Sequence, residues 1–364
     1  MRVFQKIFPK KFDTFFKKIK SNKNLDKELV AISESFINSK SYKFVSNHWH
    51  LRNISHYETI SKSGMQKLGI ETFRHYFNFF YFENSYLTNL FKLIGSSDDI
   101  LLKSNFLKKH EGLDFKESIN YNCLLLALYF VLKKNQYFKF LSLLKDETYL
   151  NYNNPYIKID DQNITSDKLI SLFDLEKIED FNLINKSRIF EIGAGSGRLS
   201  ECILSIRNIP NYTVCDIPPS IFISYKRLKL AFPHKKIKLL VDIEDKAELN
   251  QEIKNNDITF IFPHQINLIE KNFFDLSIAI DCFHEMDKKT INYYFENVSN
   301  ISQKIYFSIW EKTKNWDSGG IFKKTEVLNF DKGDYPIPKN WKNKFKKNLI
   351  FPSNQIGLGF DFEK

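Results

Sequence analysis

The arrangement of apolar and polar residues along the chain changes character near residue 187. From Leu25 to about Leu150, apolar and aromatic residues recur at helical spacing without the alternation of a strand, which predicts a helical domain. After Lys186, short apolar runs alternate with helical segments, which is typical of a parallel α/β sheet. The strands expected are 188–192, 212–216, 258–262, 276–281 and 304–309, and the helices expected are 197–206, 220–231, 244–254 and 288–297.

Three further segments complete the predicted organisation. The polar stretch 151–163 contains Pro155 and predicts a loop, after which Thr165 caps a helix. Residues 236–242 have the composition of another strand, and the last 30 residues are expected to supply an antiparallel closing pair. The chain is therefore expected to be an α/β protein of three parts. These are a segment 1–23, an α-helical domain 24–160 and a sheet domain 161–364.

Positive charge is concentrated in the first 23 residues. They hold eight basic residues and one acidic residue, so that +7 of the total +11 lies there. An apolar face at i, i+3, i+4 and i+7, made by Phe12, Phe15, Phe16 and Ile19, predicts an amphipathic helix. One hypothesis is peripheral contact with an anionic membrane surface, and the other is docking of the apolar face on the protein itself.

Composition argues against several classes of protein. The chain has seven Arg against 47 Lys, and arginine is the usual bidentate reader of nucleic acids, so no nucleic-acid partner is expected. The longest uncharged apolar run, 123–132, is too short to span a bilayer. Four widely spaced cysteines fit neither a zinc ribbon nor a disulfide scaffold. A cytoplasmic location, with membrane contact only through residues 1–23, is the expectation.

A glycine-rich turn carries the clearest chemical signal. Residues 188–198 form an expected strand, a turn with the pattern E-x-G-x-G-x-G, and a helix start. A dinucleotide site would need G-x-G-x-x-G, with the pyrophosphate over the helix N-terminus. The carboxylate of Glu191 instead repels phosphate and suits the positively charged end of S-adenosylmethionine. We therefore expect S-adenosylmethionine as the cofactor.

The next strands add cofactor contacts. Asp216 closes the second strand, where a carboxylate can accept hydrogen bonds from both ribose hydroxyls. His264 and Gln265 follow the third strand, where an adenine is expected, and the alternative is a polar loop. Asp281, after the fourth strand, is expected to touch the cofactor. The full expected set is Glu191, Gly193, Ala194, Gly195, Gly197, Asp216, Ile217, His264, Gln265 and Asp281.

The residues after the fourth strand are expected to face the methyl acceptor. Methyl transfer to oxygen is an in-line displacement in which a hydroxyl proton must be removed. His284 is a candidate base, because a neutral imidazole is available near pH 7. Glu285 is the other candidate, or it orients His284 or binds sugar hydroxyls. A structural role for His284 stays open, and no metal site is predicted, since Asp281, His284 and Glu285 alone make a weak set of ligands.

Taken together, these motifs resemble the bacterial sugar O-methyltransferase family. The similarity runs from about residue 45 to 310 and rests on Asn47-His-Trp49, Gly69 to Arg74, Asn154-Pro155, Glu191 to Arg198, Tyr212 to Pro219 and Phe283 to Met286. The resemblance implies a Rossmann-like class I methyltransferase sheet with an N-terminal α-helical part. It also implies a sugar or nucleotide-linked glycan acceptor in capsule or lipopolysaccharide assembly. Cys282 and His284 stand where the family usually has Ser and Gln, which favours Glu285 as the base.

Three other functions remain open at this point. One is methylation of another small molecule, phenolic or amine. Another is a catalytically silent methyltransferase fold that acts as a scaffold, although the expected cofactor residues are intact. The third is nucleic-acid binding through the basic segment, against which stands the confinement of the charge to one end of the chain.

Overall fold

The computed structural model of the protein describes residues 25–45, 47–65, 105, 107–146, 155–159, 161–179, 186–315, 326–349 and 355–362. The basic segment 1–23 lies outside these residues, so both hypotheses about it stay predictions. The chain forms two compact units. The first, called here the sheet unit, comprises 1–62, 183–200 and 208–364, and the second, the helical unit, comprises 63–182 and 201–207.

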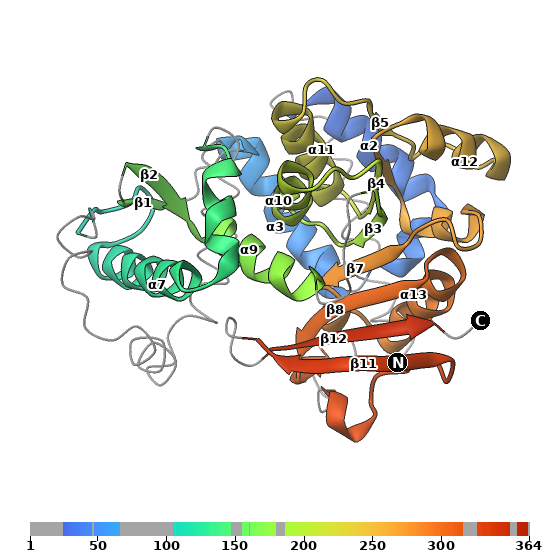
Figure 1. Cartoon of the computed structure of the whole chain (residues 1–364). Helices are drawn as coiled ribbons and strands as arrows, with labels where there is room; N and C mark the ends of the chain where they lie inside the picture. The colour runs from blue at the N-terminus through green and yellow to red at the C-terminus, as the bar shows by residue number, and fades with distance from the viewer. Residues whose placement is uncertain are drawn as a thin grey trace. The chain divides into compact units, whose positions relative to one another are not determined.

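The sheet unit is built on an eight-stranded sheet with the order β11-β12-β8-β7-β3-β4-β6-β5 (Figure 1). Every neighbouring pair from β8 to β5 is parallel, whereas β12 runs antiparallel to β8 and to β11. The strands are β3 (Arg188–Ile192), β4 (Asn211–Cys215), β5 (Ile237–Leu239), β6 (Ile258–Ile261), β7 (Leu276–Ile280), β8 (Lys304–Trp310), β11 (Trp341–Asn348) and β12 (Gln355–Phe362). The predicted α/β fold and the antiparallel closing pair are confirmed. The further strand expected within 236–242 is β5, at the edge of the sheet. A separate antiparallel pair joins β9 (Lys312–Asn315) to β10 (Glu326–Asn329).

The strand order reverses at β3. From β3 the chain continues to β4 on one side, and later returns to place β7 and then β8 on the other side. Because all these strands are parallel, their carboxyl ends lie at the same edge of the sheet. Open α/β sheets bind ligands at such a reversal, outside the carboxyl ends of the strands.

Helices cover both faces of the sheet, which explains why the central strands are apolar throughout. Alternate strand residues such as Phe190 and Ile261 share one core with α12 (Lys246–Asn255) and α13 (Lys288–Ile301). On the opposite face, Tyr225 of α11 (Ser220–Ala231) packs edge-on against Phe260 with ring centroids 5.5 Å apart. Strands buried on both faces lose the alternation of polar residues, and β4 is buried at every position.

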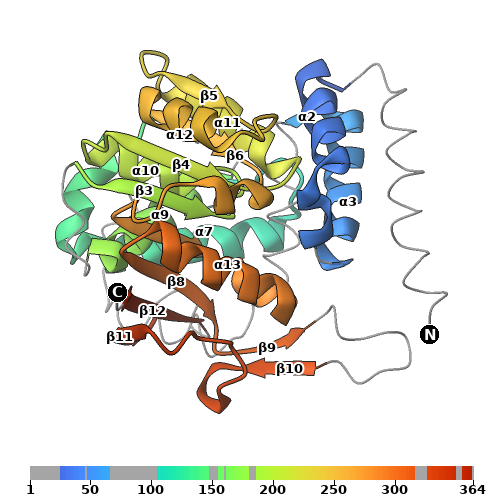
Figure 2. The ribbon, with the colours of Figure 1, turned by 90° about the vertical axis from the view of Figure 1, so that its right-hand side faces the viewer.

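The first helices among the described residues belong to the sheet unit. They are α2 (Lys27–Asn38), the 3-10 helix η2 (Lys40–Phe44) and α3 (Asn47–Ser63), and a hydrogen bond between the hydroxyls of Ser33 and Tyr57 joins α2 to α3. Figure 2 shows two of these helices, α2 and α3. Phe36 of α2 packs edge-on against Phe262, with ring centroids 5.0 Å apart. The sequence had placed 24–160 in one helical domain, but the structure groups residues 25–62 with the sheet because α2 packs directly on it.

The helical unit contains α7 (Phe115–Lys133), η3 (Gln136–Leu143) and α9 (Ser166–Ile178). As predicted, Thr165 caps α9 by accepting a hydrogen bond from the backbone of Lys168. The expected loop at 151–163 is wrong in part, because β1 (Tyr156–Ile159) and β2 (Gln162–Thr165) pair as an antiparallel hairpin. The alternation that makes these strands is short and is interrupted by the polar turn. Among the described residues, no helix combines the length and apolar character needed to cross a membrane.

Candidate functional site

The glycine-rich turn leaves β3 in a conformation that needs glycine. Gly193, Gly195 and Gly197 have φ values of 68°, 58° and 75°, in the left-handed region. A Cβ on Gly193 would lie 2.8 Å from the Cβ of Cys282, and one on Gly197 would lie 3.0 Å from the Cβ of Ser224. A Cβ on Gly195 would meet nothing within 4 Å, so this glycine is required by its backbone angle and borders open space.

Asp216 ties the turn to the end of β4. Its two carboxylate oxygens accept hydrogen bonds from the backbone N–H of Gly195, at 2.9 Å, and of Ile217, at 2.7 Å. Within the turn, the N–H of Gly197 donates to the carbonyl of Ala194 at 2.9 Å. Burial raises the pKa of Asp216 to about 7, although the two N–H bonds oppose this rise, and the charge of Glu191 adds to it. The structure therefore brings the predicted turn residues and Asp216 together.

Glu191 lies beneath the turn and is almost completely buried. One of its carboxylate oxygens accepts hydrogen bonds from the hydroxyl of Tyr212, at 2.8 Å, and from Ser200 of α10 (Arg198–Ile206). The carboxyl group is thus held by hydroxyls from β4 and from α10. It is a buried acidic group fixed at the end of β3.

The carboxyl end of β7 meets the end of β3. The thiol of Cys282 donates to the carbonyl of Ile192 at 3.5 Å, and Asp281, with φ of 57°, is held by Ser308 of β8 through contacts of 3.3–3.4 Å. Burial raises the pKa of the Cys282 thiol well above its usual range. Four nearby carboxylates raise it further, those of Glu285, Asp216, Asp281 and Glu191. Acidic side chains at or after the ends of three strands therefore act on the same thiol.

His284 is buried in the short helix η6 (Phe283–Glu285), and its ring lies edge-on to Trp310, with centroids 5.9 Å apart. Its Nδ1 accepts a hydrogen bond from the backbone N–H of Trp310 at 3.4 Å. A neutral imidazole that accepts at Nδ1 carries its proton on Nε2. In this arrangement Nε2 is a hydrogen-bond donor and does not accept a proton, whereas the neighbouring Glu285 is half-buried and belongs to the carboxylate group around Cys282.

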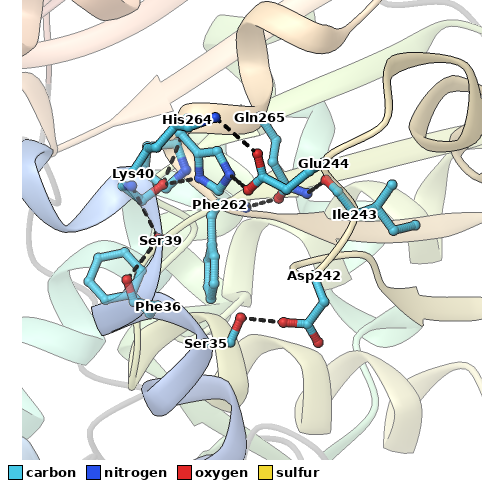
Figure 3. Close-up of polar contacts among 12 residues, drawn as sticks. Ser35, Phe36, Ser39, Lys40, Asp242, Ile243, Glu244, Phe262, His264 and Gln265 are labelled. Atoms are coloured by element: carbon cyan, nitrogen blue, oxygen red, sulfur yellow. Dashed lines mark hydrogen bonds and ion pairs between the residues drawn. The ribbon is translucent and has the colours of Figure 1, made fainter.

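The structure gives the two expected adenine residues partners inside the protein (Figure 3). Gln265 is 0% exposed, and its amide donates to the carbonyls of Leu240 and Ile243 and accepts from the N–H of Phe262, each at 2.7 Å. Both of its amide hydrogens are used, which leaves none for an adenine. The ring nitrogens of His264 are bonded to two residues that the sequence analysis missed, Ser41 and Glu244, described below. The polar side-chain atoms of His264 and Gln265 are therefore bonded within the protein and are not directed at an adenine.

A metal centre finds no support in the part of the chain that the structure describes. There, His, Cys, Asp and Glu side chains form no group of three or more that could hold an ion. Asp281, His284 and Glu285, the weak alternative set, do not make such a group.

Comparisons with known proteins add a structural likeness only. No family model matches the chain, and no curated protein matches it. Similar solved structures include the magnesium protoporphyrin IX methyltransferase of Synechocystis with bound SAH, at 13% identity and a TM-score of 0.37, covering 54% of this chain and 86% of that one. S-adenosylmethionine-dependent methyltransferases of Aquifex aeolicus and Clostridium acetobutylicum match at 12% and 14% identity, with TM-scores of 0.34 and 0.32. Each covers 53% of this chain, and 92% and 91% of its own. At these values the likeness alone identifies neither a cofactor nor a substrate.

Proposed function

We propose that the protein is an S-adenosylmethionine-dependent methyltransferase. The observation that carries the proposal is the glycine turn after β3, which the N–H of Gly195 ties to the carboxylate of Asp216 at the strand-order reversal, with the buried carboxyl group of Glu191 at the end of the same strand. S-adenosylmethionine brings a sulfonium and an ammonium group, and two opposite charges ~6 Å apart attract by about 3 kcal/mol at an effective dielectric constant of ~20. A dinucleotide would bring its pyrophosphate into the same negative field and be repelled.

The linear order of the strand ends suggests how the cofactor would lie. Asp216 would accept the ribose hydroxyls, because each of its oxygens has a lone pair beyond the N–H bond that it already accepts. The turn after β3 and Glu191 would receive the amino acid end. The adenine would then extend toward the end of β6, the neighbour of β4, and the methyl group would point toward the residues after β7.

For the acceptor, we propose a sugar hydroxyl of a surface glycan or of its nucleotide-linked precursor, as the family resemblance implies. Glu285 would take the hydroxyl proton while the oxygen attacks the methyl carbon and the carbon–sulfur bond breaks. The products are a methyl ether, S-adenosylhomocysteine and a proton on Glu285, which is released to solvent. His284 would donate from Nε2 to a neighbouring sugar oxygen and so orient the acceptor. A hydrogen-bond donor next to carboxylate acceptors can bind the several hydroxyl groups of a sugar, each of which both donates and accepts.

The first test is isothermal titration of the purified chain with S-adenosylhomocysteine and, as a matched control, with NAD. We expect a single site for S-adenosylhomocysteine and no heat with NAD. Binding of NAD in place of S-adenosylhomocysteine, or of neither, would overturn the cofactor assignment.

The second test addresses the acceptor. The chain is incubated with S-adenosylmethionine and a panel of nucleotide sugars, phenols and amines, and mass spectrometry follows a gain of 14 Da. Methylation within the sugar group supports the proposal. Methylation confined to a phenol or an amine keeps the methyltransferase and replaces the acceptor.

A further inference from the structure

Hydrogen bonds link Ser41 to His264, and His264 to Glu244, in the sheet unit. Figure 3 shows the bond between His264 and Glu244. Ser41 of η2 accepts the backbone N–H of His264 at 2.8 Å, and its oxygen lies 2.7 Å from the Nδ1 of the same residue. The Nε2 of His264 lies 2.6 Å from a carboxylate oxygen of Glu244. With Ser41 donating to Nδ1 and Nε2–H donating to Glu244, a neutral ring satisfies every contact. We call Ser41, His264 and Glu244 the clasp.

The order Ser–His–Glu resembles the hydrogen-bonded chain of serine hydrolases, but here it serves to hold structure. Ser41 is 0% exposed, so no substrate can reach its oxygen. That oxygen also accepts the N–H of His264, which directs its proton to the ring. The clasp therefore fastens η2 to the short helix η5 (Pro263–Leu268).

Aromatic contacts reinforce the same junction. Phe44 of η2 stacks on Tyr293 of α13 with ring centroids 4.0 Å apart and an interplanar angle of 23°. The hydroxyl of Tyr293 donates to the carbonyl of Pro263, the first residue of η5, at 2.8 Å. The start of η5 is thus held from η2 both directly and through α13.

The place of η5 gives this junction a functional meaning. It follows β6, the strand next to β4, and the N–H of Asp216 donates to the carbonyl of Ile261 at 3.3 Å. Adjacent strands are ~4.8 Å apart, so η5 begins about one strand spacing beyond the carboxylate proposed for the ribose. A nucleoside bound there, with its sulfur side toward β3, extends its base toward η5.

We propose that Ser41 and Glu244 are positioning residues for the adenine of the cofactor. They fix His264, and with it the backbone of η5, in the shape that receives the base. Residues 25–45, although outside the sheet, then form part of the cofactor site. This inference rests on the proposed function.

The test compares Ser41→Ala with Ser35→Ala. Both serines lie within residues 25–45. Ser35 forms a hydrogen bond with Asp242, two residues before Glu244, but takes no part in the clasp. Ser41→Ala leaves a buried N–H and a buried ring nitrogen of His264 without Ser41, so that His264 and the backbone of η5 can shift from the conformation that receives the base. We expect a Kd for S-adenosylhomocysteine at least tenfold higher in Ser41→Ala, and within twofold of wild type in Ser35→Ala.

A second readout separates positioning from general damage. S-inosylhomocysteine differs from S-adenosylhomocysteine only in the base, so a loss of folded protein raises both Kd values by one factor. We expect Ser41→Ala to reduce the preference of the wild type for the adenine ligand. If Ser41→Ala does not fold, Glu244→Ala takes its place, because the side chain of Glu244 is 54% exposed and its truncation is tolerable.

Equal effects of Ser41→Ala and Ser35→Ala, or an unchanged preference for adenine, would overturn the inference while wild-type binding upholds the proposed function. Failure of the wild type itself to bind S-adenosylhomocysteine would overturn both.

Discussion

Titration of Asp216 should make the stability and the cofactor affinity of the wild type change in opposite directions with pH, and Asp216→Asn should remove both dependences. Burial raises the pKa of Asp216 from 3.8 to about 7 in the folded protein. A carboxyl group with a raised folded-state pKa contributes stability that is full below its unfolded pKa and is lost as the pH rises through its folded pKa. Between pH 5 and pH 8 the ionisation of Asp216 spans about two units, and at 1.36 kcal/mol per unit the loss is about 2.7 kcal/mol.

The neutral side chain of Asn has no such dependence on pH. It cannot accept both backbone N–H bonds that Asp216 accepts, which costs about 1–3 kcal/mol at every pH. The diagnostic quantity is therefore the change with pH in the difference between the two proteins. Asp216→Asn should gain about 2–3 kcal/mol relative to wild type from pH 5 to pH 8.

Urea denaturation of both proteins at the two pH values measures this quantity, because all other titrating groups cancel in the comparison. A difference in unfolding free energy that is constant from pH 5 to pH 8 would refute the reasoning, since Asp216 would then have an ordinary pKa.

Cofactor binding should follow the opposite trend. If the ionised form of Asp216 accepts the ribose hydroxyls, affinity for S-adenosylhomocysteine should rise about tenfold per unit as the pH approaches 7 from below, and then level off. Asp216→Asn should remove this rise and bind more weakly by about 1–3 kcal/mol at pH 8. Titration calorimetry at several pH values measures both effects, and wild-type affinity in Asp216→Asn would exclude it as a ribose ligand.

Three further predictions concern the acceptor side, the turn and the N-terminal segment. Glu285→Gln should lower turnover about 100-fold in a methylation assay and leave the cofactor affinity unchanged. His284→Gln keeps a hydrogen-bond donor and should lower turnover less. The reverse order of the two variants would make His284 the base. Gly193→Ala should lower the free energy of unfolding by about 1–3 kcal/mol more than Gly195→Ala. Both substitutions strain a positive φ, but only the first places a Cβ 2.8 Å from the Cβ of Cys282. Equal losses on urea denaturation would contradict this. The full chain should sediment with anionic vesicles and lose this binding when Phe15 and Phe16 become Ser with all lysines retained; retention of binding by the double variant would end the membrane hypothesis.

The parts of the fold that were predictable have local signals. The spacing of the glycines predicts the turn at 193–197. Strands that are buried on both faces are predicted by apolar runs bounded by polar residues. The position of Asp216 followed from the length of one helix and one strand. The hairpin 156–165 was missed because its four-residue strands are too short to show a period.

The remaining features depend on contacts between distant residues. Ser41 and His264 are separated by 223 positions, and no motif near either residue predicts that they are in contact. The sequence predicted that Gln265 contacts an adenine or lies in a polar loop, but in the structure its amide donates to two carbonyls of the chain between β5 and α12. The donor state of Nε2 in His284 likewise follows from one backbone N–H of β8, 26 residues later.

The docking of α2 and η2 on η5 has a consequence for synthesis of the chain. These helices are synthesised before their partners at 242–264, which follow about two hundred residues later, after most of the helical unit. Closing so long a loop costs only slightly more entropy than closing a shorter one, because the cost grows with the logarithm of length. The delay is therefore kinetic, and until residues 262–264 emerge Phe36 lacks its ring partner Phe262 and Ser41 lacks its partner His264. Nascent chains that stop short of β6 should be the ones that recruit chaperones.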